Sequence, residues 1–153
     1  MINALKALIS LTTLLLLFWQ CSSDTLYRSN QHAIQVGLSS IYTKKDTMPK
    51  LSAYGLGRED SLIYDTIAVK ELFLPLKFDI DSTIYVIKIL QRSDTVIFYH
   101  TKEQIYISDE DGFTFNMYLT RIAFTTNIID SAAFINPAII YNETLQNVKL
   151  YLR

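Results

Sequence analysis

The sequence predicts an all-β protein, an antiparallel β-sandwich of the immunoglobulin-like or Greek-key kind, preceded by an N-terminal signal helix. After Cys21, apolar and polar residues alternate with a period of about two in one short segment after another, which is the pattern of half-buried strands. No segment there keeps the 3.6-residue period of an amphipathic helix over ten residues. Polar turns rich in Asn, Asp and Ser separate the segments.

The first 20 residues are predicted to be a signal peptide of the lipoprotein type. The thirteen-residue, predominantly apolar run 7–19 follows a start with one positive charge, Lys6. This run is shorter than the roughly 20 apolar residues of a spanning helix, so a retained N-terminal anchor is the second choice. Cys21, the only cysteine, stands between the run and a polar stretch, where a bacterial lipoprotein signal has the cysteine that is acylated.

Lipidation at Cys21 would bind the mature chain to a membrane, because several acyl chains hold a protein durably and one holds it only marginally. Residues 18–20 (Phe-Trp-Gln) depart from the small residue that usually precedes the cut. The alternative is an ordinary thiol in a signal peptide that is cut elsewhere. The prediction is a membrane partner through the lipid anchor, in the bacterial cell envelope and most specifically at the outer membrane.

Bulk composition limits the remaining possibilities. Residues 21–31 are polar enough for a tether, and 32–153 suit a single domain with its own core. The 14 basic and 15 acidic residues include no basic run, which argues against nucleic-acid binding. Apolar residues make up 50% of the chain, too many for a disordered protein.

Strand candidates in the first half begin at residue 32, where Ile34, Val36 and Leu38 fall on one face. Pro75 cannot donate a ladder hydrogen bond, so its segment is expected at an edge or strand end. Residues 83–90 are β-branched and aromatic and suit a strand buried on both faces. The candidates are 32–42, 51–56, 61–69, 71–76 and 83–90.

The second half continues the pattern, for a total of eight to ten strands. Residues 91–94 are expected to be a turn, and 113–124 alternate clearly. Residues 129–135 could instead hold a helical turn. The candidates are 95–100, 102–108, 113–124, 127–130, 138–141 and 148–152.

Few residues point to chemistry. Asp109 and Asp111 lie in an acidic turn that ends at Gly112 and could bind calcium, but a solvated hairpin turn explains them equally simply. His32 and His100 stand alone in the sequence and are expected on strand surfaces. Nucleophile-elbow, phosphate-loop and dinucleotide motifs are missing, so no catalytic residue and no cofactor are predicted.

Three classes of function remain open. The first is a non-enzymatic binding or accessory module, whose protein or glycan partner could dock on outward-facing strand tyrosines. The second is a secreted or anchored hydrolase with a carboxylate site assembled from loops. Its candidate residues are Asp79, Asp81, Asp109 and Asp111. The third is a structural subunit of an envelope assembly.

The order of several short pieces resembles a family of uncharacterised Bacteroidota lipoproteins defined only as a domain of unknown function. The pieces are 51–57, 74–76, 94–99, 107–108 with 112–113, and 141–144 with 147–151. The resemblance implies the sandwich fold and the lipoprotein location and supplies no catalytic residue. It also implies a pair of cysteines that this chain lacks, since Asp111 precedes Gly112 and no cysteine lies within 22–31.

Overall fold

The computed structural model describes residues 32–109, 112–140 and 143–153, which form ten strands. The signal peptide 1–20, the lipidation candidate Cys21, the tether 21–31 and the calcium candidate Asp111 lie outside the described residues. Within the described ranges, no helix has the length and apolarity needed to cross a bilayer.

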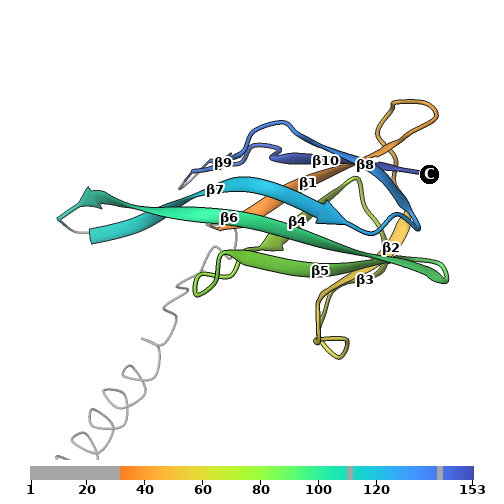
Figure 1. Cartoon of the computed structure of the whole chain (residues 1–153), viewed down its shortest axis with the longest axis horizontal. Coiled ribbons are helices and arrows are strands. Elements are labelled where there is room, and N and C mark those ends of the chain that lie inside the picture. The colour runs from red at the N-terminus through yellow and green to blue at the C-terminus, as the bar shows by residue number, and fades with distance from the viewer. Residues whose placement is uncertain (1–31, 110–111, 141–142) are drawn as a thin grey trace, which may run out of the picture.

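Two sheets make up the molecule (Figure 1). The six-stranded sheet has the order β3-β2-β5-β6-β7-β9 and the four-stranded sheet the order β4-β1-β10-β8. The all-β antiparallel sandwich predicted from the sequence is confirmed. The strands of the first sheet are β3 (Leu62–Ala68), β2 (Lys50–Gly55), β5 (Ser82–Ile89), β6 (Arg92–Ser108), β7 (Gly112–Phe124) and β9 (Ala138–Ile139). The strands of the second are β4 (Glu71–Pro75), β1 (Ala33–Ser40), β10 (Val148–Leu152) and β8 (Ile129–Phe134).

One pairing in the described sheets is parallel. β1 and β10 run in the same direction, with Val36 opposite Val148 and Ser40 opposite Leu152. On its other side β1 pairs with β4 in antiparallel fashion, and β4 is an edge strand that ends at Pro75, as expected for a residue without an amide hydrogen. The first and last strands of the domain are therefore neighbours at the centre of the four-stranded sheet.

The core lies between the sheets and is filled by the apolar side of the predicted alternation. Ile34, Val36 and Leu38 of β1 are all buried, which confirms the assignment of their face. Residues from both sheets join one cluster. Its largest fully buried members from the other strands are Leu51, Leu72, Leu74, Ile87, Phe98, Met117, Ile129 and Leu150.

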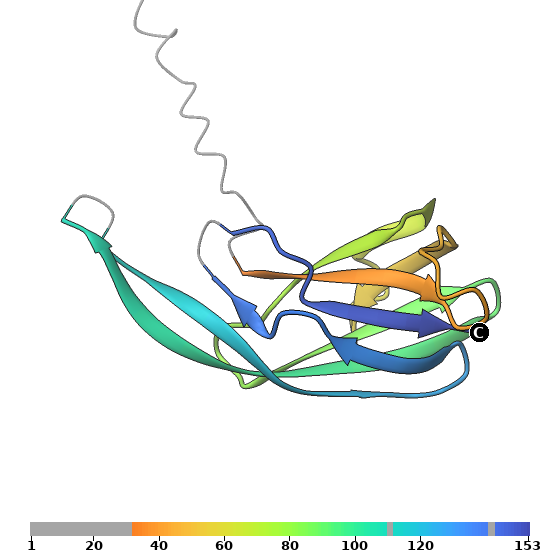
Figure 2. The same ribbon diagram turned by 90° about the horizontal axis from the view of Figure 1, so that it is seen from above.

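β6 and β7 form a long hairpin whose outer half projects beyond the sandwich, an extension that we name the arm (Figures 1 and 2). The sequence predicted two strands, 95–100 and 102–108, and this division is wrong because β6 is continuous over 17 residues. Residues 101–104 are exposed, so no apolar side chain marks the strand there. Backbone pairing with β7 nevertheless continues, with Lys102 opposite Met117 and Gln104 opposite Phe115.

The suggested helical turn at 129–135 is also wrong. β8 occupies Ile129–Phe134 and pairs with β10, where Ala132 lies opposite Leu150. Residues 130–133, after the buried Ile129, are partly covered and include two alanines, and Phe134 is exposed, so the strand shows no clear alternation in the sequence. An edge strand of this kind takes its conformation from its neighbour rather than from its own pattern.

Asp94, assigned to a turn from the sequence, lies within β6 and is only 1% exposed. Its Oδ2 accepts hydrogen bonds from the amides of Ile128 and Ile129, both at 2.7 Å. Its Oδ1 accepts from the Asn127 amide at 2.9 Å and from the Thr125 hydroxyl. The carboxylate thus fixes the connection that carries the chain from β7 in one sheet to β8 in the other.

Candidate functional site

One hollow of the described surface lies at one end of the sandwich, and we name it the end groove. It has a volume of about 380 Å³, within the range of small-molecule sites. It is bounded by the β2–β3 turn and the β4–β5 connection, with β5 alongside. Its apolar wall consists of Leu56, Ile63, Leu76, Ile80 and Ile84.

Local chemistry explains how the β2–β3 turn is held. Gly57 adopts a φ of 75°, which a glycine accepts without strain, and the turn is closed by hydrogen bonds from the Arg58 amide to the Gly55 carbonyl and from the Ser61 amide to the Arg58 carbonyl. The Leu56 amide donates to the Ile84 carbonyl at 3.1 Å, which ties the turn to β5. The wall is therefore built on a fixed backbone.

Two cations and several hydroxyl groups complete the end groove. Arg58 and Lys77 line it together with Ser61, Ser82 and Thr83. Neither cation makes a salt bridge with a residue that the structure describes, and no Asp or Glu is among the groove's lining residues. The groove therefore combines an apolar wall with positive charge that nothing in the wall neutralises.

Thr83 and His100 form a buried pair at the edge of the groove. His100 Nε2 lies 3.1 Å from Thr83 Oγ1, and that hydroxyl oxygen also accepts a hydrogen bond from the Lys77 amide at 2.9 Å. Both residues are 3% exposed, so the prediction that His100 lies on a strand surface is wrong. β6 turns this residue inward because it follows Val96 and Phe98 on the buried face.

Burial is the main reason why the pKa of His100 lies below its usual value. The charge of Asp81 opposes this shift, and the charge of Lys102 adds to it. A neutral imidazole next to a hydroxyl is the arrangement of a nucleophile and its base. Here, however, the hydroxyl is almost fully covered and already accepts from Lys77, so the pair serves to join β5, β6 and the β4–β5 connection.

Tyr85 connects the two sheets beneath the groove. Its hydroxyl donates to the carbonyl of Pro75, the last residue of β4. Burial raises the pKa of Tyr85 to about 12, so it stays a neutral hydrogen-bond donor. This bond holds β4 and β5 together at the end of the sandwich where the groove opens.

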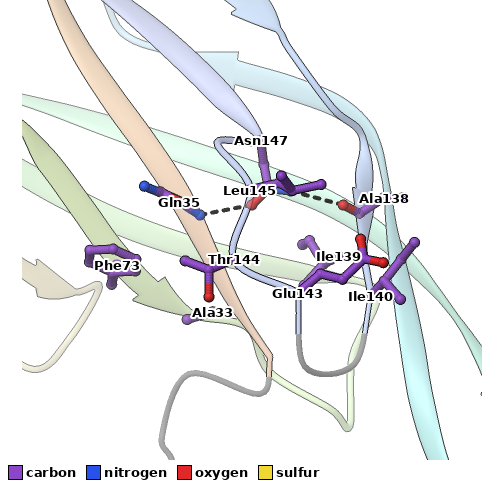
Figure 3. A pocket seen from close by; sticks show the side chains of 10 residues that line it. All are labelled: Ala33, Gln35, Phe73, Ala138, Ile139, Ile140, Glu143, Thr144, Leu145 and Asn147. Atoms are coloured by element: carbon purple, nitrogen blue, oxygen red, sulfur yellow. Dashed lines mark hydrogen bonds between the residues drawn. The ribbon is translucent and has the colours of Figure 1, made fainter.

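A second hollow is too small to bind a ligand (Figure 3). Its volume of about 20 Å³ is enough for a single water molecule. Asn147 crosses it: Oδ1 accepts from the Gln35 amide at 2.9 Å, and Nδ2 donates to the Ala138 carbonyl at 2.9 Å (Figure 3). These bonds join the segment before β10 to β1 and β9, so the hollow is part of the framework.

The arm carries aromatic side chains. Tyr106 and Phe113 lie opposite each other, with ring centroids 5.4 Å apart, and are 55% and 65% exposed. At the root of the arm, the ring of Phe78 lies between those of His32 and Phe115. The sequence predicted that some strand tyrosines face outward, and Tyr106 is one.

The carboxylates proposed for a hydrolase lie on different elements. Asp79 and Asp81 are in the β4–β5 connection, whereas Asp109 ends the arm and accepts a hydrogen bond from Tyr106. Across the residues that the structure describes, no three His, Cys, Asp or Glu side chains gather as a metal site. The calcium alternative involves Asp111, outside the described residues, and stays a prediction.

The domain was then compared with known proteins. Residues 50–152 match a family of unknown function, DUF6452. The chain belongs to the DUF6452 family. Comparisons with curated proteins and with solved structures gave no match. The DUF6452 match includes β2 to β10, and so every residue of the end groove and the arm hairpin, while β1 precedes it.

Sequence reasoning missed the end groove of this DUF6452 domain. Its cations Arg58 and Lys77 are 19 positions apart in two separate turns, and only the fold brings both to one hollow. Large apolar residues within the polar connections could have indicated the groove. Leu56 and Ile80 are two such residues, and both are exposed in the structure.

Proposed function

We propose that this DUF6452 protein is a lipid-anchored, non-enzymatic binding module of the bacterial cell envelope, attached at the outer membrane through acyl chains on Cys21. The observation that carries the anchoring is the single cysteine, which is separated by one residue from the thirteen-residue apolar run 7–19 and lies before a polar stretch. The resemblance to Bacteroidota lipoproteins supports the same location.

The binding role is supported by the end groove. It is the size of a small-molecule site, has an apolar wall and places two cations at its edge. The best nucleophile–base pair near it, Thr83 with His100, is covered and bonded to the backbone. This arrangement favours binding over catalysis.

The anchor is tested by fractionation of cells that produce the full chain with a C-terminal tag. Wild type should be processed at Cys21 and sediment with membranes, and globomycin should block that processing. Cys21→Ala should show the same block without the drug, whereas the neighbouring Ser22→Ala should behave as wild type. Unchanged processing and partitioning of Cys21→Ala would rule out lipid anchoring.

A second candidate, a subunit of an envelope assembly, is favoured by the exposed aromatic pair of the arm. Tyr106 and Phe113 provide a large contact area at low entropic cost, as aromatic residues do in protein interfaces. Pull-down of the tagged protein from membranes should then recover a partner that is lost with Tyr106→Ala combined with Phe113→Ala. Equal recovery with both chains would exclude the arm as the contact.

A further inference from the structure

We infer that the end groove binds a single-chain amphiphile with an anionic head group of the fatty-acid carboxylate type. The inference rests on the proposed binding function and assigns that function a ligand class. It follows from two independent properties of the same hollow, its uncovered apolar wall and the sign of its charge.

The apolar wall calls for an aliphatic occupant. Leu56, Ile63 and Ile80 are 54%, 41% and 44% exposed although they belong to one hollow. Three large aliphatic side chains grouped around a concave surface gain free energy when a hydrocarbon replaces the water against them. None of the groove-lining residues apart from Tyr85 is aromatic, and Tyr85 is buried, so the groove offers no platform on which a sugar or a nucleobase could stack.

The charge of the groove selects an anion. Arg58 and Lys77 both line it, Ser61 and Ser82 add hydroxyl donors, and no lining residue is acidic. The other groove of this region, on β2 and β3, is different because Glu59 and Asp65 line it along with its lysines. A guanidinium and an ammonium that have no acidic partner are suited to charge-assisted hydrogen bonds with a carboxylate.

Together, these properties require a ligand with two parts. A small anion would leave the aliphatic wall in water, and a neutral hydrocarbon would leave Arg58 and Lys77 without a counter-charge. A fatty-acid carboxylate satisfies both, with its chain along Leu56, Ile63 and Ile80 and its head group at the two cations. Leu76 and Tyr85, both buried, close the inner end of the groove.

The test uses calorimetric titration of residues 22–153, which lack the acylated cysteine and keep every residue that the structure describes. Dodecanoate below its micelle concentration should bind with a stoichiometry near one. Dodecyltrimethylammonium has the same chain with the opposite charge, and butyrate has the same head group with almost no chain. Each should bind at least about tenfold more weakly, a loss that corresponds to one good charged or apolar contact.

Variants locate the site. Arg58→Gln with Lys77→Gln should weaken dodecanoate binding at least about tenfold and bring it close to that of the cationic amphiphile. Arg92→Gln with Lys88→Gln removes the same charges from residues outside the groove and should leave binding unchanged. All four side chains are exposed, so the variants should unfold at the wild-type temperature.

Ile80→Asp gives a second, independent measurement, because it places a negative charge in the apolar wall and should abolish dodecanoate binding. The inference is overturned if dodecanoate does not bind, if the two dodecyl ligands bind equally, or if the groove variants bind as the control pair does. The fractionation of Cys21→Ala does not depend on the groove, so failure of the ligand assignment and failure of the anchor are separate results.

Discussion

Asp94→Asn is the change that tests most directly how the two sheets are joined. The carboxylate accepts four hydrogen bonds, two at each oxygen, from Thr125, Asn127, Ile128 and Ile129. An asparagine has one acceptor oxygen, so two of these donors would face its NH₂ group. Each lost hydrogen bond to a buried charged group costs about 1.5–3 kcal/mol, so the loss of two should lower the free energy of unfolding by about 3–6 kcal/mol.

Urea denaturation followed by far-UV circular dichroism measures this loss, and a thermal melt should show a midpoint roughly 10–20 °C lower. Asp130→Asn is the matched control. Asp130 pairs with Arg153 at 2.9 Å on the surface, so its loss should cost about 1 kcal/mol or less.

The pH dependence of the free energy of unfolding tests the same role of Asp94. Burial raises the pKa of Asp94, but the hydrogen bonds from Thr125, Ile129, Asn127 and Ile128 outweigh burial and leave it below its usual 3.8. A carboxyl group with a lowered pKa stabilises the folded state above its unfolded value, and that stabilisation is lost as the pH falls through the folded pKa. The difference between wild type and Asp94→Asn should therefore shrink below about pH 3.8. A cost for Asp94→Asn no larger than for Asp130→Asn would refute the structural role of this carboxylate.

Three further outcomes are expected. Burial lowers the pKa of His100 below 6.5, so the unfolded chain binds a proton at a higher pH than the folded chain does. The free energy of unfolding measured in urea should therefore fall below about pH 6.5, by up to about 1.4 kcal/mol per pH unit. His100→Gln should reduce this slope. Tyr106→Ala with Phe113→Ala should change the free energy of unfolding by about 1 kcal/mol or less, because both rings are exposed, while amide hydrogen exchange in the arm accelerates. Gly37→Ala would place its Cβ 1.7 Å from Gln146 Nε2, which is the far end of a flexible side chain. The substitution should therefore lower the free energy of unfolding by about 1 kcal/mol. In a Gln146→Ala background it should cost nothing, which a double-mutant cycle would measure.

Alternation in the sequence was enough to predict the sandwich because most strands have one buried and one exposed side. The strand that carries Ile34, Val36 and Leu38 is predicted for this reason, whereas residues 83–90 are predicted from their β-branched and aromatic composition. The prediction was wrong where that condition does not hold. The arm has solvent on both sides at residues 101–104, and β8 at the sheet edge is only partly covered, so neither shows the period of two.

The polar interior was equally invisible in the sequence. Asp94 follows Gln91, Arg92 and Ser93, and the sequence predicts a turn for all four residues. Its carboxylate is nevertheless buried, and the donors that bind it lie 31 to 35 positions further along the chain. The partners of His100 and the cations of the end groove are likewise set by contacts between distant segments. Local pattern determines which face of a strand is buried, whereas a site depends on which strands become neighbours.

The parallel pairing of β1 with β10 determines when folding can be completed. Gln35 and Asn147 exchange backbone and side-chain hydrogen bonds across 112 positions, so β1 gains its second neighbour only from the final residues of the chain. Contacts of such long range make folding slow. A chain that leaves the ribosome or crosses a membrane from its N terminus therefore cannot close the four-stranded sheet until its last strand is free.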